Sequence, residues 1–136
     1  MKIVARLLVL LPLLWVEGVW AVDCPSEDYD LNSQAEVDAL GATGCDRVSG
    51  YLFIGDSTEI TNTDITNLDG LANITSVGGY LRIDSNSALT NLDGLANLTS
   101  VGGYLSIWNN AALTNCGALA RVLGSPNGPP DDAVGG

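Results

Sequence analysis

The chain has 136 residues and a formal net charge of −11 at pH 7. Such an acidic surface repels nucleic acid and anionic lipid, and it favours solubility outside the cell. The sequence contains no histidine, which excludes Ser-His and Cys-His nucleophile pairs and histidine-based zinc or iron sites.

Residues 1–21 are predicted to be a secretory signal peptide. Lys2 and Arg6 give a positive start, and an apolar run follows from Leu7 to Val16. This pattern is typical of a signal peptide, and the run is too short to span a bilayer as a helix. Cleavage is expected after Ala21, leaving 115 residues with three arginines, fifteen acidic residues and a formal charge of −12. The protein is therefore expected to be secreted or on the cell surface, in an extracellular or periplasmic compartment. The alternative is an uncleaved membrane anchor.

Residues 22–47 are predicted to form an N-terminal cap that contains one short helix. The helix is expected from Asn32 to Leu40, where Ser33 followed by Glu36 matches a capping box. Gly41 is one of the residues expected to end it. Such a cap would cover the open apolar end of a stack of repeats.

Three cysteines follow the signal segment. Cys24 and Cys45 flank the cap and are the expected disulfide pair, because export places the chain in an oxidising compartment. Cys116 is then unpaired, which in a secreted protein indicates a free thiol or a partner on another chain.

The centre of the chain repeats itself every 24 residues. Thr66 to Leu89 reads TNLDGLANITSVGGYLRIDSNSAL, and Thr90 to Leu113 reads TNLDGLANLTSVGGYLSIWNNAAL. Leucine and isoleucine alternate with polar or aromatic residues, which indicates strands with one face inside and one outside. Residues 48–123 are therefore predicted to be stacked repeats, because one unit cannot bury its apolar face alone. About five residues are inserted near 55–61, where the first repeat is longer.

Turns between the strands are marked by glycine and asparagine. Gly78-Gly79 and Gly102-Gly103 are expected at sharp bends. Asn86 and Asn110 occupy equivalent turns, and we expect their amides to form a ladder that bonds the neighbouring backbone. The Gly/Pro-rich tail, 124–136, is predicted to be a truncated repeat.

The pattern L-x-x-L-x-x-L-x-x-V-x-G-x-L-x-I, with Cys24, Cys45 and the segment Val48 to Ile54, resembles the receptor L domain. That fold forms the ligand-binding lobes of insulin- and epidermal-growth-factor-type receptors, and similar repeats occur in secreted leucine-rich-repeat-like proteins. The resemblance covers about Cys24 to Leu123. It implies an all-β fold, a short right-handed parallel β-helix (solenoid) with three-sided rungs. It does not identify a ligand, because a fold alone does not fix function.

An outward-facing aromatic surface is the strongest candidate binding site. Three tyrosines hold the same position in successive repeats, and a second column of side chains lies beside them. Exposed aromatic residues in a row can stack on sugars or anchor a protein partner. The alternative, compatible with binding, is a ladder that only stabilises the stacked strands. The candidate binding residues are Tyr51, Phe53, Tyr80, Arg82, Tyr104 and Trp108.

Metal binding and catalysis have weaker support. Asp84 with Asn86, or Asp56 with Glu59, could offer oxygen ligands to calcium, but neither pair matches a loop of known spacing. The repeated Asp-Gly pairs are better explained as turn chemistry. No metal, cofactor or catalytic residue is predicted.

These observations predict a non-catalytic extracellular recognition module, receptor- or adhesin-like, for a protein or glycan ligand. No nucleic-acid partner and no membrane span are expected after the signal peptide, and the chain is expected to be a fragment of a longer protein. The alternative is a structural solenoid segment of a cell-envelope protein. Ice binding through the column of Thr66, Thr90 and Thr114 and an extracellular enzyme are weaker alternatives. Asn73 and Asn97 lie in sequons that would accept glycans in a eukaryote.

Overall fold

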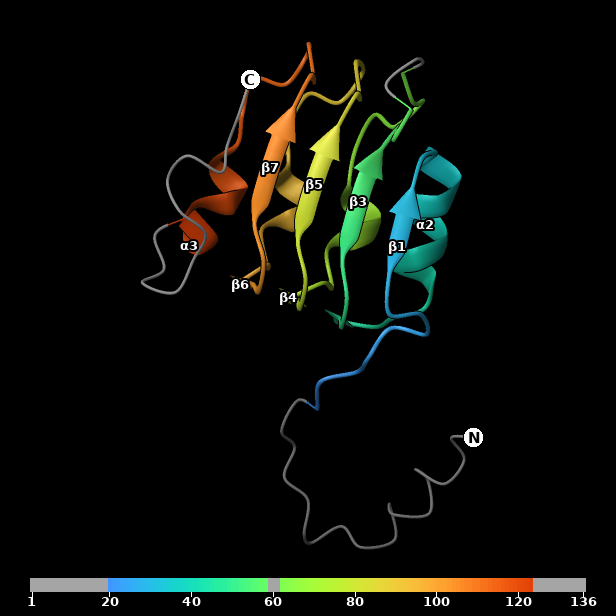
Figure 1. Ribbon diagram of the computed structural model, residues 1–136, viewed down its shortest axis with the longest axis vertical. Coiled ribbons are helices and arrows are strands. Elements are labelled where there is room, and N and C mark those ends of the chain that lie inside the picture. Colours follow the sequence, from blue (N-terminus) through green and yellow to red (C-terminus); the bar gives the residue numbers. More distant parts are fainter. Residues whose placement is uncertain (1–19, 59–61, 124–136) are drawn as a thin grey trace, which may run out of the picture.

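The computed structural model describes residues 20–58 and 62–123. Most of the predicted signal peptide and the whole of the 124–136 tail therefore lie outside the described residues. Figure 1 looks on to the larger of two parallel sheets, with α2 at one end of the stack and α3 at the other.

Both sheets are parallel, and each repeat adds one strand to each of them. The larger sheet has the order β1-β3-β5-β7, and the smaller has the order β2-β4-β6. The strands of the larger sheet are β1 (Tyr29–Leu31), β3 (Leu52–Gly55), β5 (Leu81–Asp84) and β7 (Leu105–Trp108). The strands of the smaller sheet are β2 (Arg47–Val48), β4 (Ser76–Val77) and β6 (Ser100–Val101).

Helical segments form the side of the stack behind the larger sheet (Figure 1). Two are α-helices and three are short 3₁₀-helices within the described residues. They are α2 (Gln34–Ala42), η2 (Asp69–Leu71), η3 (Asp93–Leu95), η4 (Gly117–Leu119) and α3 (Ala120–Leu123).

The predicted fold class is wrong. The protein is not all-β: its described residues form a mixed α/β structure with two parallel sheets and helices, and they show no closed solenoid or β-helix. A leucine-rich-repeat architecture is not shown either. The apolar residues Leu92, Leu95 and Leu98 recur every third residue, a helical spacing and not the alternation of a strand. The Asn91 side-chain oxygen accepts a hydrogen bond from the Asp93 N–H at 2.9 Å, which turns the chain into η3 instead of a third strand.

The 24-residue period is confirmed by the strand register. Leu81 of β5 lies opposite Leu105 of β7, which is 24 residues later. Leu52 of β3 lies opposite Leu81, 29 residues later, so the extra residues of the first repeat are accommodated between these strands. The inserted loop was predicted near 55–61, of which residues 59–61 lie outside the described part.

The cap contains the predicted helix, shifted by two residues. Ser33 is the N-cap residue of α2 and accepts a hydrogen bond from the Glu36 N–H, while the Glu36 carboxylate accepts one from the Asn32 N–H at 2.8 Å. This reciprocal pair is a capping box. Gly41 lies within α2 instead of ending it, and a β-carbon there would approach the Gly70 carbonyl oxygen to 2.2 Å. Glycine at this position allows the backbone of α2 to lie directly against η2.

The disulfide between Cys24 and Cys45 is present, and it ties the start of the cap to its end. Cys116 is a free cysteine with intermediate exposure. Its position corresponds to the fully buried Leu68 and Leu92 of the two preceding repeats. The thiol therefore ends a column of core leucines.

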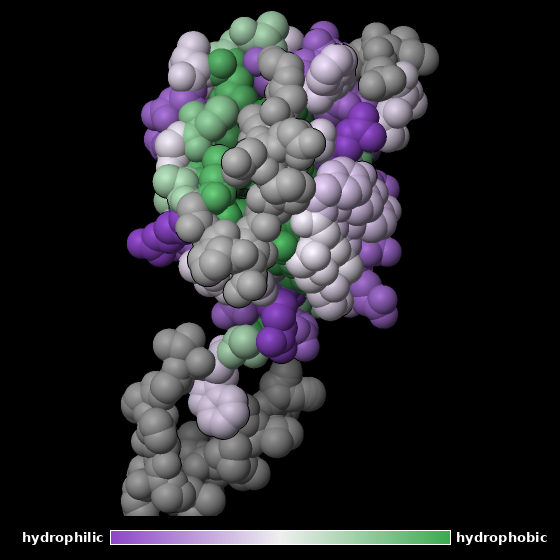
Figure 2. All heavy atoms as spheres, turned by 60° about the vertical axis from the view of Figure 1, so that its left-hand side comes forward, coloured by the Kyte–Doolittle hydropathy of each residue, from purple (hydrophilic) through white to green (hydrophobic). Residues whose placement is uncertain are grey.

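The core runs between the larger sheet and the helical side, and nearly all of its members come from equivalent positions in successive repeats. Figure 2 looks on to the β7 end of the stack and shows hydrophobic residues in the middle of this face, with hydrophilic residues on either side. The core includes the fully buried leucines and isoleucines Leu52, Ile54, Leu71, Ile74, Leu81, Ile83, Leu95 and Leu98.

The asparagine ladder is also confirmed. The Asn86 amide donates to the Ile54 carbonyl at 3.0 Å and to the Asn110 side-chain oxygen at 3.1 Å. The Asn110 amide in turn donates to the Ile83 carbonyl at 2.9 Å. Each amide thus bonds to the backbone of the preceding repeat. This satisfies polar groups that would otherwise be buried without a partner.

Candidate functional site

A ladder of three tyrosines crosses one edge of the outer face of the larger sheet. Tyr51, Tyr80 and Tyr104 each come directly before a strand, so the parallel register places them side by side. The ring centroids of Tyr51 and Tyr80 are 4.8 Å apart with an interplanar angle of 1°, and those of Tyr80 and Tyr104 are 4.9 Å apart at 8°. Tyr104 is 50% exposed, whereas the other two rings are half-buried. We name these three residues the tyrosine ladder.

Acidic side chains of the cap lie at the other end of the tyrosine ladder. The Tyr51 N–H donates to the Asp28 carboxylate at 2.9 Å, and the Tyr51 hydroxyl donates to the Asp30 carboxylate at 3.3 Å. The negative charge of Asp30 raises the pKa of Tyr51, because it disfavours the phenolate. The pKa of Tyr80 is raised mainly by its desolvation within the ladder. The ladder therefore presents neutral phenols, which can donate hydrogen bonds at neutral pH.

Beside the ladder, Arg82 packs on Phe53. The Arg82 guanidinium carbon lies 5.2 Å from the centroid of the Phe53 ring, within the range of a cation–π contact. Arg82 also forms an ion pair with Asp84, whose side chain is fully buried. Phe53 itself is only 5% exposed. It therefore supports the arginine and offers little surface of its own to a ligand.

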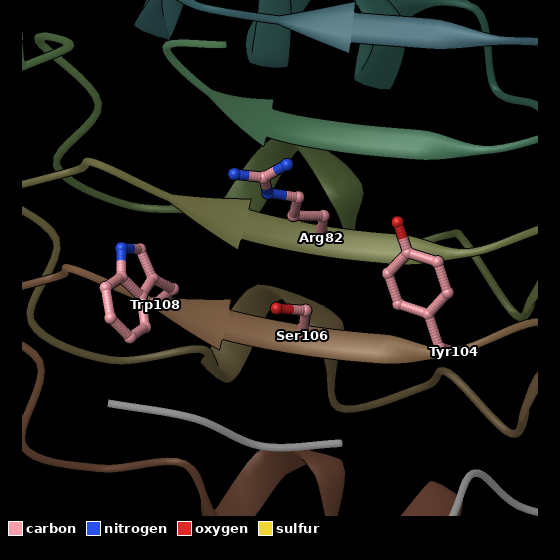
Figure 3. A pocket seen from close by; sticks show the side chains of 4 residues that line it. All are labelled: Arg82, Tyr104, Ser106 and Trp108. Atoms are coloured by element: carbon pink, nitrogen blue, oxygen red, sulfur yellow. The ribbon is translucent and has the colours of Figure 1, made fainter. Parts of the chain in front are cut away.

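A shallow hollow of about 340 Å³ lies next to the exposed end of the ladder. It is lined by Arg82, Tyr104, Ser106 and Trp108 (Figure 3). Tyr104 and Trp108 stand at the two ends of β7, Ser106 lies between them, and Arg82 comes from the neighbouring β5. Trp108 is 51% exposed. The hollow thus combines two aromatic walls with a hydroxyl and a guanidinium group.

The structure brings together most of the residues predicted from the sequence. Tyr104, Arg82 and Trp108 share the hollow, and the other two tyrosines continue from it along the ladder. Sequence reasoning missed β1, and with it the two aspartates beside Tyr51. The alternation of Tyr29 and Leu31 around Asp30 was the signal that could have revealed this strand.

The structure does not assemble either of the calcium sites considered from the sequence. Asp84 and Asn86 are fully buried and bond to protein groups. Asp56 accepts hydrogen bonds from Thr58, and Glu59 lies outside the described residues. Within the part of the chain that the structure describes, no group of three or more histidine, cysteine or acidic side chains could hold a metal ion.

Comparison with known families places this site in a larger group of proteins. The family model of the receptor L domain matches residues 44–119, more than half of the chain and nearly all of the repeats. No curated protein and no solved structure gives a match. No helix in residues 20–58 and 62–123 is both long and apolar enough to cross a membrane. The chain belongs to the receptor L domain family.

Proposed function

We propose that the protein is a non-catalytic extracellular recognition module and that its ligand binds on the outer face of the larger sheet. Membership of the receptor L domain family supports a ligand-binding, receptor-like module. The observation that carries the choice of surface is the hollow lined by Arg82, Tyr104, Ser106 and Trp108, at the end of the tyrosine ladder.

The chemistry of this surface suits a protein or glycan ligand. The stacked rings of the tyrosine ladder cover one another's faces, so their edges and hydroxyl groups are what the ladder offers. Tyr104 and Trp108 still expose about half of their surface, and partly exposed aromatic side chains are frequent anchors in binding interfaces. The Cys24–Cys45 disulfide is typical of a secreted protein. It supports an extracellular location together with the predicted signal peptide.

The proposal is tested by glycan-array screening and by capture of secreted proteins, followed by Trp108→Ala. Loss of a central aromatic contact should weaken binding by about 2 kcal/mol, or roughly thirtyfold. Asn97→Ala is the control, because Asn97 is exposed and its side chain bonds only to the Ala72 carbonyl among the contacts described. Equal affinity of Trp108→Ala and the unmodified protein for every captured ligand would reject this surface as the binding site.

A further inference from the structure

The larger sheet ends at β7 with an open edge. Among the described residues, no strand lies beyond β7. The carbonyls of Tyr104 and Trp108 accept hydrogen bonds from β5 and the residue after it, at 2.9 and 3.3 Å. Because alternate residues of a strand direct their backbone groups to opposite neighbours, the N–H and C=O groups of Leu105 and Ile107 point to the open edge. Such an edge is a template for pairing with another strand.

The β7 end is also the part of the stack without acidic residues. The segment 94–123 contains no Asp or Glu, and Arg121 is its only charged residue. In contrast, residues 22–47 at the opposite end contain seven acidic residues. Two copies of a chain with a formal charge of −12 after residue 21 repel each other. This repulsion is weakest where their β7 ends meet.

The side chains of β7 are symmetric about its centre. On the outer face, Ser106 is flanked by the aromatic residues Tyr104 and Trp108, and on the inner face Leu105 and Ile107 flank the same point. We propose that β7 pairs antiparallel with β7 of a second copy of this chain, about a two-fold axis at Ser106. A two-fold interface uses the same patch on both copies, and this symmetry of β7 provides such a patch.

The proposed register follows from the direction of the backbone groups. Leu105 lies opposite Ile107 of the second copy, and these two residues exchange backbone hydrogen bonds because both point to the edge. Tyr104 then lies opposite Trp108 of the second copy on the outer face. Aromatic pairs in this arrangement stabilise neighbouring strands. The pairing covers part of the two side chains that are about half exposed in the single chain, and it joins two larger sheets into one.

The first test uses cross-linking at the two-fold axis. In the proposed register Ser106 faces its own copy in a non-hydrogen-bonded pair, with α-carbons about 4.5 Å apart, which is within reach of a disulfide. The variant Ser106→Cys is made together with Cys116→Ser, so that the new thiol is the only free one. Mild oxidation with a glutathione buffer should convert it to a covalent dimer. Ser100→Cys in the same background is the control, since this exposed residue lies on β6 of the other sheet, and it should remain single-chain.

Sedimentation of the unmodified chain lacking residues 1–21 provides the second test. We expect a mass that rises with concentration to twice that of one chain and no further. Tyr104→Glu should abolish dimerisation, and adding Trp108→Arg to the same chain should restore it, because only the antiparallel register places these two positions opposite each other. The proposal is overturned by a single-chain mass at all concentrations, as expected if residues 124–136 cover the edge, by larger head-to-tail assemblies, or by failure of the rescue.

Discussion

Replacement of Asn86 by alanine tests whether the asparagine ladder holds the repeats together. Asn86 is fully buried, and its amide donates to the Ile54 carbonyl and the Asn110 side-chain oxygen, while its own oxygen accepts from the Thr63 hydroxyl. Asn86→Ala removes these three hydrogen bonds, each of which contributes about 1 kcal/mol. It also leaves the buried Ile54 carbonyl without its amide donor, at a cost of about 1–3 kcal/mol. We therefore expect the free energy of unfolding to fall by about 3–5 kcal/mol.

Urea denaturation followed by far-ultraviolet circular dichroism measures this loss, provided that the slope with denaturant is unchanged. Asn97→Ala is the matched control, because Asn97 is exposed and its side chain makes a single described hydrogen bond, to the Ala72 carbonyl at 2.8 Å. The control should lose less than about 1 kcal/mol. A loss for Asn86→Ala no greater than that of the control would refute the view that buried amide bonds link one repeat to the next.

Two further predictions concern the cap and the tyrosine ladder. Replacing Cys24 and Cys45 together by serine opens a loop with a sequence separation of 21 and should lower the free energy of unfolding by about 3 kcal/mol in urea; a change below about 1 kcal/mol would show that the unfolded chain gains little freedom. Asp30→Asn should lower the pKa of Tyr51, because the Asp30 charge is the main cause of its increase, and ultraviolet absorbance of the phenolate will show an unchanged titration if this cause is wrong. Since the pKa of Tyr51 is raised in the folded protein, its contribution to stability is fully present below the unfolded pKa of about 10 and is lost as the pH rises through the folded pKa.

Much of the local organisation could be predicted from the sequence because it depends on spacing along the chain. The 24-residue period determines which residues lie opposite each other in parallel strands, so the columns of Tyr51, Tyr80 and Tyr104 followed directly. The capping box at Ser33 and the pairing of Cys24 with Cys45 also depend on residues that are close in sequence. The resemblance to the receptor L domain came from the same repeated pattern and is confirmed by the family comparison.

Only the tertiary structure decided the fold class and the shape of the candidate site. Leucines at every third position are compatible with a turn of helix or with a bend between strands, and contacts between neighbouring repeats favoured η2 and η3 over a third sheet. Phe53 alternates like an outward residue, yet Arg82 from the next repeat covers it. The aspartates beside Tyr51 arrive on β1, which pairs with β3 across the intervening cap. These features arise from contacts between residues distant in sequence, and the pattern within one repeat does not contain them.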